Sequence, residues 1–356
     1  MRGIQLLRAE AGGADFRDDL PVPEPGPGEV RVRVASAAIC GTDRHIVHWD
    51  DSVSHLLTPP VVLGHEFCGH VDALGDGVPG WESGDFVSAE MHLTCNRCRA
   101  CKVGNAHVCE ETRIVGLQAD GAFAEFLVIP ARNLVRLDPD VVKPHIGSFL
   151  DALGNAVHTV QSASSIAGRH VMMSGYGAIG AMAASVVEFE GAKSLTITEV
   201  GEEHLARARA WADGLSGRVP VTVCDPTQED DLATKIRDET GGGVDVVLEM
   251  SGAPPAIDLG LEVLYQGGEM MMLGIGKEAD LTIRDFSRRI IFKGLCLRGI
   301  LGRRIFATWD EMLGLLARGL DLEHIVTHRL PLSAFQEGID LLDAGRAHKV
   351  VLDPAS

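Results

Sequence analysis

The sequence predicts an α/β protein in which a doubly wound parallel sheet is joined to a smaller β-rich part. Strands and helices alternate through the middle of the chain, and short strands separated by glycine-rich turns fill the first part. The length of 356 residues suits two domains of roughly 150 residues each. We expect a β-rich domain over residues 1–150, a parallel-sheet domain over 151–298 and a return to the first domain over 299–356.

In the first segment, Val30, Val32 and Val34 alternate with arginines, which is typical of a half-buried strand. A proline-rich stretch, 21–28, precedes that strand and excludes regular helix. Further strands are expected near Val61, Val71 and Val87 and over 123–129.

In the middle segment, strands are expected over 171–173, 195–197, 221–224, 244–248 and 270–273, with helices between them. Such alternation predicts parallel strands with right-handed crossovers. In the last segment we expect helices over 306–317 and 334–344 and strands over 328–330 and 349–352. That segment is too short for a core of its own, so it should pack onto the first domain.

The composition excludes several classes of protein. Apolar residues make up 46% and charged residues 23%, which is ordinary for a folded chain and argues against disorder or a coiled coil. The net charge of −18 disfavours binding to nucleic acid or to an anionic membrane. The N-terminus has no apolar stretch long enough for a secretory signal, so a cytoplasmic location is expected.

A glycine motif indicates dinucleotide binding. Gly175, Gly177 and Gly180 form G-x-G-x-x-G between an expected strand and an expected helix, and Glu199 follows about 20 residues later. The helix N-terminus would donate to a pyrophosphate, and the carboxylate would accept from the ribose hydroxyls and repel a 2′-phosphate. NAD is therefore favoured over NADP; the alternative is a glycine turn without a ligand.

Four cysteines within one short stretch predict a structural zinc site. Cys95, Cys98, Cys101 and Cys109 supply four thiolates, which suits a closed tetrahedral site. An iron–sulfur cluster fits less well, because its usual run has a shorter last gap followed by proline. Disulfides are the other alternative.

A second, looser set of ligand types is Cys40, His65 and Glu66. Cys40 precedes an expected helix, whose N-terminus lowers a thiol pKa, and His65 follows a glycine at which the chain can bend. Two or three ligands would leave an open position on a catalytic zinc. Thr42 and His45 share a helix face and could pass a proton to solvent. The alternatives are a core cysteine, a buried histidine, a capping threonine and a surface histidine.

Together these residues resemble the zinc-dependent medium-chain alcohol dehydrogenase family over nearly the whole chain. Within that family the chain is most similar to the branch that oxidises L-threonine. The resemblance rests on these motifs: Cys40-Gly41-Thr42-Asp43, His45-x3-Trp49-Asp50, Gly64-His65-Glu66, the four cysteines, Cys109-x2-Thr112-Arg113-Ile114-x-Gly116, Gly121-Ala122-Phe123-Ala124-Glu125, Leu153-Gly154-Asn155-Ala156-Val157-His158-Thr159, the glycine motif, Ser251-Gly252-Ala253-Pro254, and Gly302-Arg303-Arg304 with Trp309.

The resemblance implies a GroES-like catalytic domain built from both chain ends, a Rossmann domain between them and two zinc ions per chain. It implies catalytic zinc on Cys40, His65 and Glu66, with Thr42 and His45 as the proton relay. It also implies cofactor contacts at Ile179, Glu199, Leu273, Gly274, Ile275, Ile300 and Leu301.

The chain departs from the family pattern at three positions. Asp151 stands where many members have a glutamate near the zinc, His204 where the family often has an arginine at the adenosine ribose, and Leu301 where it has a threonine. The last two are expected to retune the binding of NAD without changing the cofactor.

The implied activity is hydride transfer from the secondary alcohol of L-threonine to NAD, which gives 2-amino-3-oxobutanoate. A polyol or amino-alcohol dehydrogenase is the alternative enzyme. A non-catalytic dinucleotide-binding protein would be expected to lack a zinc ligand or the relay. For the substrate we expect Trp49 and Asp50 at the rim, with Glu90, His92 and Asp151 as further contacts; Trp49 in the core and a solvated Asp50 are the alternative. An apolar strand expected over 290–297 would be an open edge, which favours a homotetramer.

Overall fold

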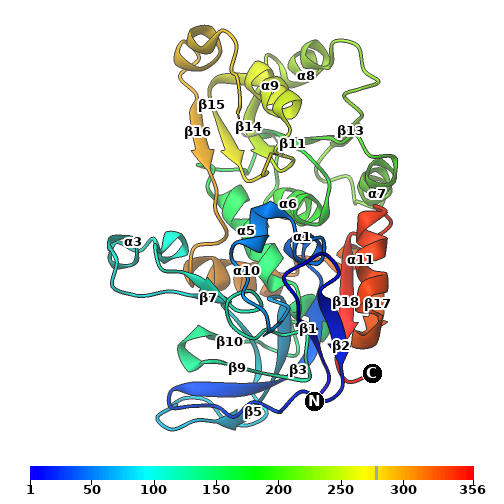
Figure 1. Ribbon diagram of the computed structural model, residues 1–356. Coiled ribbons are helices and arrows are strands. Elements are labelled where there is room, and N and C mark those ends of the chain that lie inside the picture. Colours follow the sequence, from blue (N-terminus) through cyan, green and yellow to red (C-terminus); the bar gives the residue numbers. More distant parts are fainter. Residues whose placement is uncertain (277–279) are drawn as a thin grey trace. The chain divides into compact units, whose positions relative to one another are not determined.

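In a computed structural model, which describes residues 1–276 and 280–356, the chain forms two units (Figure 1). One unit comprises Met1–Gly154 with Arg304–Ser356, and the other comprises Asn155–Arg303. Antiparallel pairing dominates the first unit and the second has a parallel sheet, so the α/β fold class expected from the sequence is confirmed.

The first unit is built around strand β3 (Glu29–Ala38), in which Val30, Val32 and Val34 are buried as the alternation predicts. β3 belongs to a seven-stranded sheet in the order β10-β6-β5-β3-β18-β17, and β9 also pairs with β3. The other strands of this unit form a sheet β2-β1-β4 and a pair β7-β8. The bounds are β1 (Gly3–Leu6), β2 (Ala14–Arg17), β4 (Val61–Val62), β5 (Phe67–Leu74), β6 (Phe86–Ala89), β7 (His92–Leu93), β8 (Arg113–Ile114), β9 (Phe126–Pro130), β10 (Leu134–Arg136), β17 (Val326–Pro331) and β18 (Lys349–Asp353).

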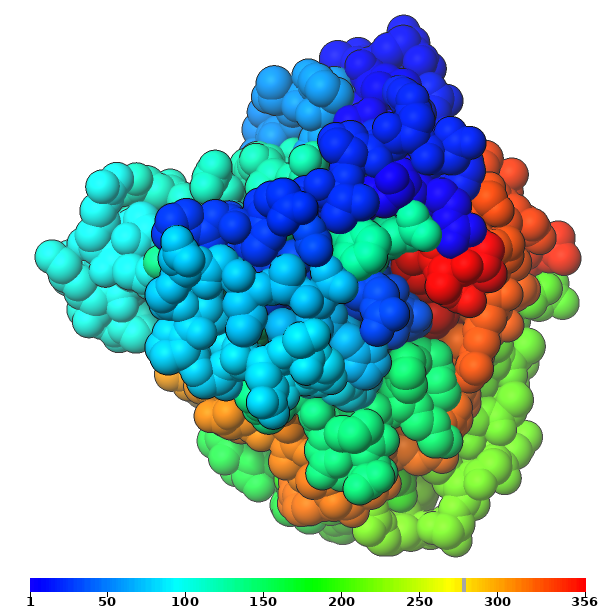
Figure 2. Space-filling model, turned by 90° about the horizontal axis from the view of Figure 1, so that it is seen from below, coloured from blue at the N-terminus to red at the C-terminus, as the bar shows by residue number. Residues whose placement is uncertain are grey.

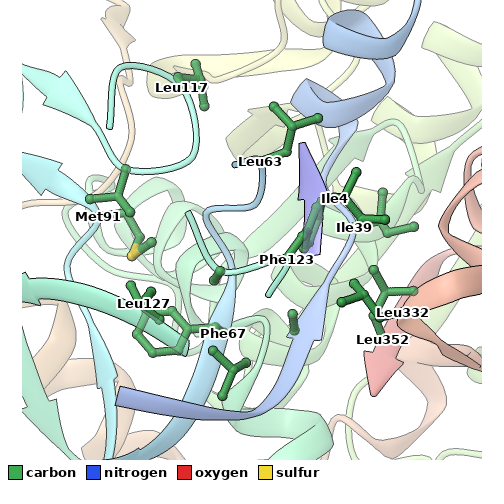
Figure 3. Close-up of a cluster of buried hydrophobic side chains, with 14 of the residues drawn as sticks. Ile4, Ile39, Leu63, Phe67, Met91, Leu117, Phe123, Leu127, Leu332 and Leu352 are labelled. Carbon is green, nitrogen blue, oxygen red and sulfur yellow. The ribbon is translucent and has the colours of Figure 1, made fainter. Parts of the chain in front are cut away.

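Both ends of the chain contribute to this unit. β18, red in Figure 1, pairs antiparallel with β3 through Val351 and Ala38. The main apolar cluster likewise joins Ile4 and Ile39 to Leu332 and Leu352 (Figure 3). At the surface the Arg2 guanidinium donates to the backbone oxygens of residues 355 and 356, and Figure 2 shows the two ends side by side. The helices here are α1 (Gly41–Val47), α2 (Asp51–Ser54), α3 (Arg99–Lys102), α4 (Pro144–Gly147), α10 (Ala307–Ala317) and α11 (Phe335–Asp343); α5 (Leu150–Gln161) contains the division between the units.

The second unit has one six-stranded parallel sheet in the order β13-β12-β11-β14-β15-β16. Numbered within the unit, this order is 3-2-1-4-5-6, the doubly wound arrangement that places a ligand at the carboxyl ends of the strands. Its strands are β11 (His170–Ser174), β12 (Ser194–Thr198), β13 (Val221–Cys224), β14 (Val244–Glu249), β15 (Leu264–Met272) and β16 (Cys296–Gly299). Its helices are α6 (Ala178–Phe189), α7 (Glu202–Asp213), α8 (Leu232–Thr240) and α9 (Pro254–Val263).

The strand expected over 290–297 is wrong in its extent. Ser287–Ile291 is helical, and strand β16 spans only Cys296–Gly299. The helical turn buries Ile290 among the core side chains and leaves Ile291 and Phe292 exposed, after which Gly294 turns the chain at φ +64°. The apolar residues of this stretch therefore meet the core at Ile290, Leu295 and Leu297 without forming one continuous strand. Within the described residues, the helices are too short or too polar to cross a membrane.

Candidate active site

Cys40 lies where β3 gives way to α1. It is the N-cap residue of α1, with extended backbone, as the sequence predicts. Its backbone N–H donates to Asp43 Oδ2 at 2.8 Å, so the carboxylate caps the helix and fixes the turn that carries the thiol.

His65 and Glu66 are brought to Cys40 by a bend at Gly64. Gly64 has φ +94°, and a Cβ there would lie 2.5 Å from the Phe123 ring, so only glycine fits. One ligand atom each from Cys40, His65 and Glu66 then lie within 4.8 Å of one another. A thiol, an imidazole and a carboxylate at that spacing suit a catalytic zinc with an open position.

Asp43 was not expected to take part in this site. It is fully buried, and its Oδ1 lies 3.6 Å from His65 Nδ1. Neither atom has a hydrogen-bond partner within the described residues, which fits a ring that a metal on its other nitrogen would hold against the carboxylate. Burial raises the pKa of Asp43 to about 6. Burial lowers the pKa of His65, but the charges of Asp43 and Cys40 outweigh it and raise the pKa overall. The signal in the sequence was the spacing Cys40-x2-Asp43, a capping pattern.

Lys349 was also missed. It opens β18 and is 2% exposed, and its Nζ lies 2.8 and 3.1 Å from the two carboxylate oxygens of Glu66 and 3.1 Å from the backbone oxygen of Ile39. Glu66 therefore lies beside Cys40 and His65 and is also paired with the cation of Lys349. The only signal for it was a lysine directly before the apolar residues 350–352 of a strand.

The proposed relay residues lie on α1. Thr42 Oγ1 is 3.8 Å from Cys40 Sγ, and His45 is exposed one turn further along. His45 Nδ1 lies 3.0 Å from Asp50 Oδ2, and Asp50 also caps α2 by accepting from the Ser52 N–H. These bonds, the one from Ser52 first, lower the pKa of Asp50 to about 2, so a carboxylate faces the imidazole.

The other expected substrate residues differ in exposure. Trp49 has φ +55°, is half-buried and packs against the main apolar cluster. Asp151 on α5 is buried, and its charge acts on His65. Glu90 is fully buried, whereas the His92 side chain is 23% exposed and hydrogen-bonded to Glu90. The structure thus brings Asp50 to His45, Asp151 to His65 and Glu90 to His92.

The four cysteines gather on a lobe that protrudes from the first unit (Figure 2, cyan). Cys109 Sγ lies 3.5 Å from Cys95 Sγ and 3.9 Å from Cys98 Sγ. Four sulfurs around zinc at 2.3 Å would be about 3.8 Å apart, so these spacings fit the metal. Burial raises the pKa of Cys109, but the backbone N–H groups of Cys95 and Glu111 lower it to about 6 overall. The eight cysteines are all unpaired by disulfides, and each lies in the described residues.

The glycine motif has the geometry of a phosphate site. Gly177 is the N-cap of α6, and a Cβ there would meet no atom within 4 Å, which leaves room for a ligand against the helix N-terminus. At Gly180 a Cβ would lie 2.2 Å from the Gly175 oxygen, so glycine allows the helix to approach the strand. Both observations fit a bound pyrophosphate.

Glu199 and His204 line a cavity of about 690 Å³ beside that motif. Glu199 Oε2 accepts from the Tyr176 N–H at 2.6 Å, and its Oε1 accepts from the N–H groups of Val200 and Gly201. The carboxylate is therefore held in place, and Oε2, which accepts from one N–H group, keeps a second lone pair for a ribose hydroxyl. Glu229, Asp231 and Glu262 line the same cavity, which makes it acidic.

The remaining residues expected to contact the cofactor follow the carboxyl ends of the strands. Leu273, Gly274 and Ile275 come after β15, and Ile300 and Leu301 come after β16. Ile275 is 91% and Leu301 60% exposed, and Ile179 is half-buried on α6. Exposed apolar side chains at this edge are placed as a nicotinamide site of this sheet requires.

Comparisons with known proteins agree with this geometry. Residues 26–139 match the alcohol dehydrogenase GroES-like domain, and residues 178–318 match the zinc-binding dehydrogenase model. The chain is 42% identical over 352 residues to L-threonine 3-dehydrogenase of Escherichia coli O1:K1, with 99% of each chain covered. Among solved structures it is similar to a zinc-binding dehydrogenase from Sinorhizobium meliloti 1021 bound to NADP (TM-score 0.88, 27% identity, 99% of each chain). It is also similar to 2R,3R-butanediol dehydrogenase from Bacillus subtilis (TM-score 0.87, 25% identity, 99% of each chain).

Proposed function

The chain belongs to the zinc-dependent medium-chain alcohol dehydrogenase family, and we propose that it oxidises the secondary alcohol of L-threonine with NAD. The observation that carries the chemistry is the gathering of Cys40, His65 and Glu66, whose ligand atoms lie within 4.8 Å of one another. The identity of 42% to a threonine-oxidising relative over the whole chain supports the substrate.

We assign the catalytic zinc to Cys40, His65 and Glu66 and the structural zinc to the four cysteines of the lobe. The catalytic zinc, when bound, lowers the pKa of the substrate hydroxyl. Asp43 orients His65, and Lys349 holds the carboxylate of Glu66. These two contacts keep the ligand set in place while substrate binds and leaves.

The chain itself moves the proton. The hydroxyl of Thr42 accepts the proton of the substrate alcohol as it gives up its own, and the exposed ring of His45, faced by the ionised Asp50, takes up the released proton and passes it to solvent. The carbinol carbon gives its hydride to the nicotinamide, so the alcohol becomes a ketone, NAD becomes NADH and one proton is released. With L-threonine the product is 2-amino-3-oxobutanoate.

We assign NAD rather than NADP because the ribose end of the cavity is acidic. Glu199 would accept from the ribose hydroxyls and repel a 2′-phosphate, and Glu229 and Asp231 add to that repulsion. His204 takes the place at the ribose that the family often gives to arginine.

We further propose that the protein is a cytoplasmic homotetramer. Two sites that need thiolate sulfur fit a reducing compartment. Among the described strands β16 pairs on one side only, with β15, and Phe292 beside it is 76% exposed. Pairing of this edge across a two-fold axis would cover both.

The test is NAD reduction by the zinc-loaded protein with L-threonine, D-threonine, 2,3-butanediol and sorbitol, with zinc measured on the same sample. L-Threonine should exceed 2,3-butanediol in kcat/KM by about 100-fold or more, because buried polar partners reject analogues that lack the ammonium and carboxylate groups. Cys40→Ala should abolish activity with all four alcohols and remove about one zinc. Cys224→Ala, which changes a buried cysteine in the core of the second unit, is the matched control and should retain both. Preference for butanediol or sorbitol would contradict the proposed substrate, and activity in Cys40→Ala would contradict the metal site.

A further inference from the structure

We propose that Glu90 is a positioning residue that, held by Trp309, fixes the ring of His92 so that His92 receives the ammonium group of the substrate. The inference rests on the proposed function, because it needs an amino alcohol as substrate. It gives a role to a buried carboxylate that the zinc site and the relay do not use.

Both carboxylate oxygens of Glu90 are engaged. Oε1 accepts from His92 Nδ1 at 2.6 Å and from the His92 backbone N–H at 2.9 Å, and Oε2 accepts from Trp309 Nε1 at 3.0 Å. Glu90 and Trp309 are 0% and 1% exposed. A buried carboxylate stays ionised only when such donors surround it, and here the donors also fix its orientation. A carboxylate so enclosed is poorly placed to meet the substrate itself.

The backbone around Glu90 is fixed as well. Asn133 Nδ2 donates to the backbone oxygens of Glu90 at 2.6 Å and His92 at 3.1 Å, and the Glu90 N–H donates to the Asn133 oxygen at 2.8 Å. Residues 90–92 therefore have little freedom, so the direction of the imidazole depends on the carboxylate and on this frame.

Three contacts bring the segment that carries His92 close to the segment that carries His65 and Glu66. β5 pairs antiparallel with β6 through Gly69 and Val87, so the strand that leads to Glu90 lies beside the strand that follows Glu66. His92 pairs with Ile114 between β7 and β8. Two residues beyond Ile114, a Cβ on Gly116 would lie 2.3 Å from the Gly64 oxygen. The segment that carries His92 thus lies along the segment that carries His65 and Glu66; Met91 and Leu63, their neighbours, contribute to one apolar cluster (Figure 3).

The hydrogen bond to the Glu90 carboxylate determines the tautomer of the His92 imidazole. With Nδ1–H donating to Glu90, the neutral ring carries its lone pair on Nε2 and is a hydrogen-bond acceptor there. An ammonium group has donors only, so this tautomer accepts from it, whereas the other tautomer would present an N–H to it. The His92 side chain is 23% exposed, so a ligand can reach it, whereas the Glu90 side chain is fully buried.

Glu90→Gln is the first test. An amide has one oxygen, so it cannot accept from both Trp309 and His92, and its NH₂ group facing Nδ1 would favour the wrong tautomer. We expect kcat/KM for L-threonine to fall about 10- to 100-fold, mainly through KM, as for other groups that orient a binding residue. For 2,3-butanediol, which has no ammonium group, the change should stay below about threefold. Zinc content should be that of the unchanged protein.

Trp309→Phe removes the indole N–H and should give a smaller loss of the same kind, selective for L-threonine. Ser88→Ala is the matched control, because it removes another buried hydrogen bond of β6, from Ser88 Oγ to the Phe67 oxygen, without touching Glu90 or His92. The ratio of kcat/KM between the two substrates should stay that of the unchanged protein in this control.

A double-mutant cycle with His92→Asn tests whether Glu90 acts through His92. Once the imidazole is gone, Glu90→Gln should cost L-threonine oxidation little more. An equal loss with both alcohols, or a full extra loss in the His92→Asn background, would overturn the inference and leave the proposed function standing. If the unchanged protein prefers butanediol, the proposed substrate and the ammonium role both fail, and the wild-type panel alone shows it.

Discussion

The buried ion pair of Lys349 and Glu66 shows how strongly one residue can affect the stability of the protein. Both side chains are buried, and both carboxylate oxygens of Glu66 accept hydrogen bonds from the ammonium group of Lys349. A buried pair contributes modestly to stability as a pair, but removing one member leaves a charge without compensation.

Lys349→Met should therefore lower the free energy of unfolding by about 3–5 kcal/mol in urea titrations of the protein after mild chelation of the catalytic metal. Lys349→Arg keeps the charge and should lose less. The double variant Lys349→Met/Glu66→Gln should recover part of the loss, because no buried charge is left alone. A loss below about 1 kcal/mol in Lys349→Met would mean that Glu66 finds another partner.

We assign the preference for NAD over NADP to Glu199. Its carboxylate is held by three backbone N–H groups at the edge of the acidic cavity, so it cannot turn away from a 2′-phosphate. Glu199→Ala should weaken the binding of NAD and narrow the difference in KM between NAD and NADP. Glu202→Ala, an exposed glutamate in the first turn of α7, is the control and should change neither. Equal use of the two cofactors by the unchanged protein would refute the assignment.

Replacement of His45 should interrupt the proposed proton relay. His45→Asn is expected to lower kcat by ~10²-fold or more, because the proton loses its acid–base path to solvent. Zinc content and NAD affinity should be kept, and added imidazole should restore part of the rate. His48→Asn, at the C-cap of the same helix but bonded to Asp343, is the matched control. Unchanged turnover in His45→Asn from neutral to alkaline pH would make His45 an ordinary surface residue.

At the scale of elements, the two metal sites differ in how they are built. The cysteine lobe draws its four ligands from one loop, whereas the other site combines an α1 N-terminus, a bend at Gly64 and a lysine of β18. A closed set of four thiolates exchanges slowly, whereas a site with an open position exchanges readily.

Brief treatment with a chelator should therefore remove about one zinc per chain and most of the activity and leave the circular dichroism spectrum as it was. Added zinc should restore the activity. Prolonged chelation should remove the second zinc and lower the free energy of unfolding. An active protein with a single zinc, or with the absorbance of an iron–sulfur cluster, would contradict the two-zinc assignment.

The same contrast explains what the sequence could predict. Gly175, Gly177 and Gly180, like the four cysteines, act within one local segment, so their spacing alone predicts their geometry. The contacts of Lys349 with Glu66 and of Trp309 with Glu90 join residues far apart in the chain, and a single sequence holds no record of such pairing. The prediction over 290–297 was wrong for another reason, because apolar residues that pack on the core can belong to a strand or to a helical turn.

At the scale of the whole molecule, β16 is an open edge among the described strands, since it pairs only with β15. It has four residues, and Cys296 on it is exposed. An apolar edge that stays uncovered invites pairing, and two-fold pairing is the commonest way to close it.

The unchanged protein should therefore be a tetramer by light scattering at micromolar concentration. Phe292→Lys should shift it toward smaller species, because a charge replaces a side chain that is 76% exposed in one chain. Leu74→Lys places the same charge at the end of β5 and is the matched control. A monomeric unchanged protein would refute the proposal.

The position of Lys349 has a consequence for biosynthesis. A chain still attached to the ribosome holds its four-cysteine lobe complete soon after residue 109 emerges, so that metal can be taken up during translation. The partner of Glu66 lies 283 residues further along and is therefore synthesised much later. Until then Glu66 has no lysine to neutralise it, and β18 is not there to pair with β3. The proposed structural zinc site can therefore form early in the synthesis of this chain, whereas the proposed catalytic centre is complete only after β18 has been made.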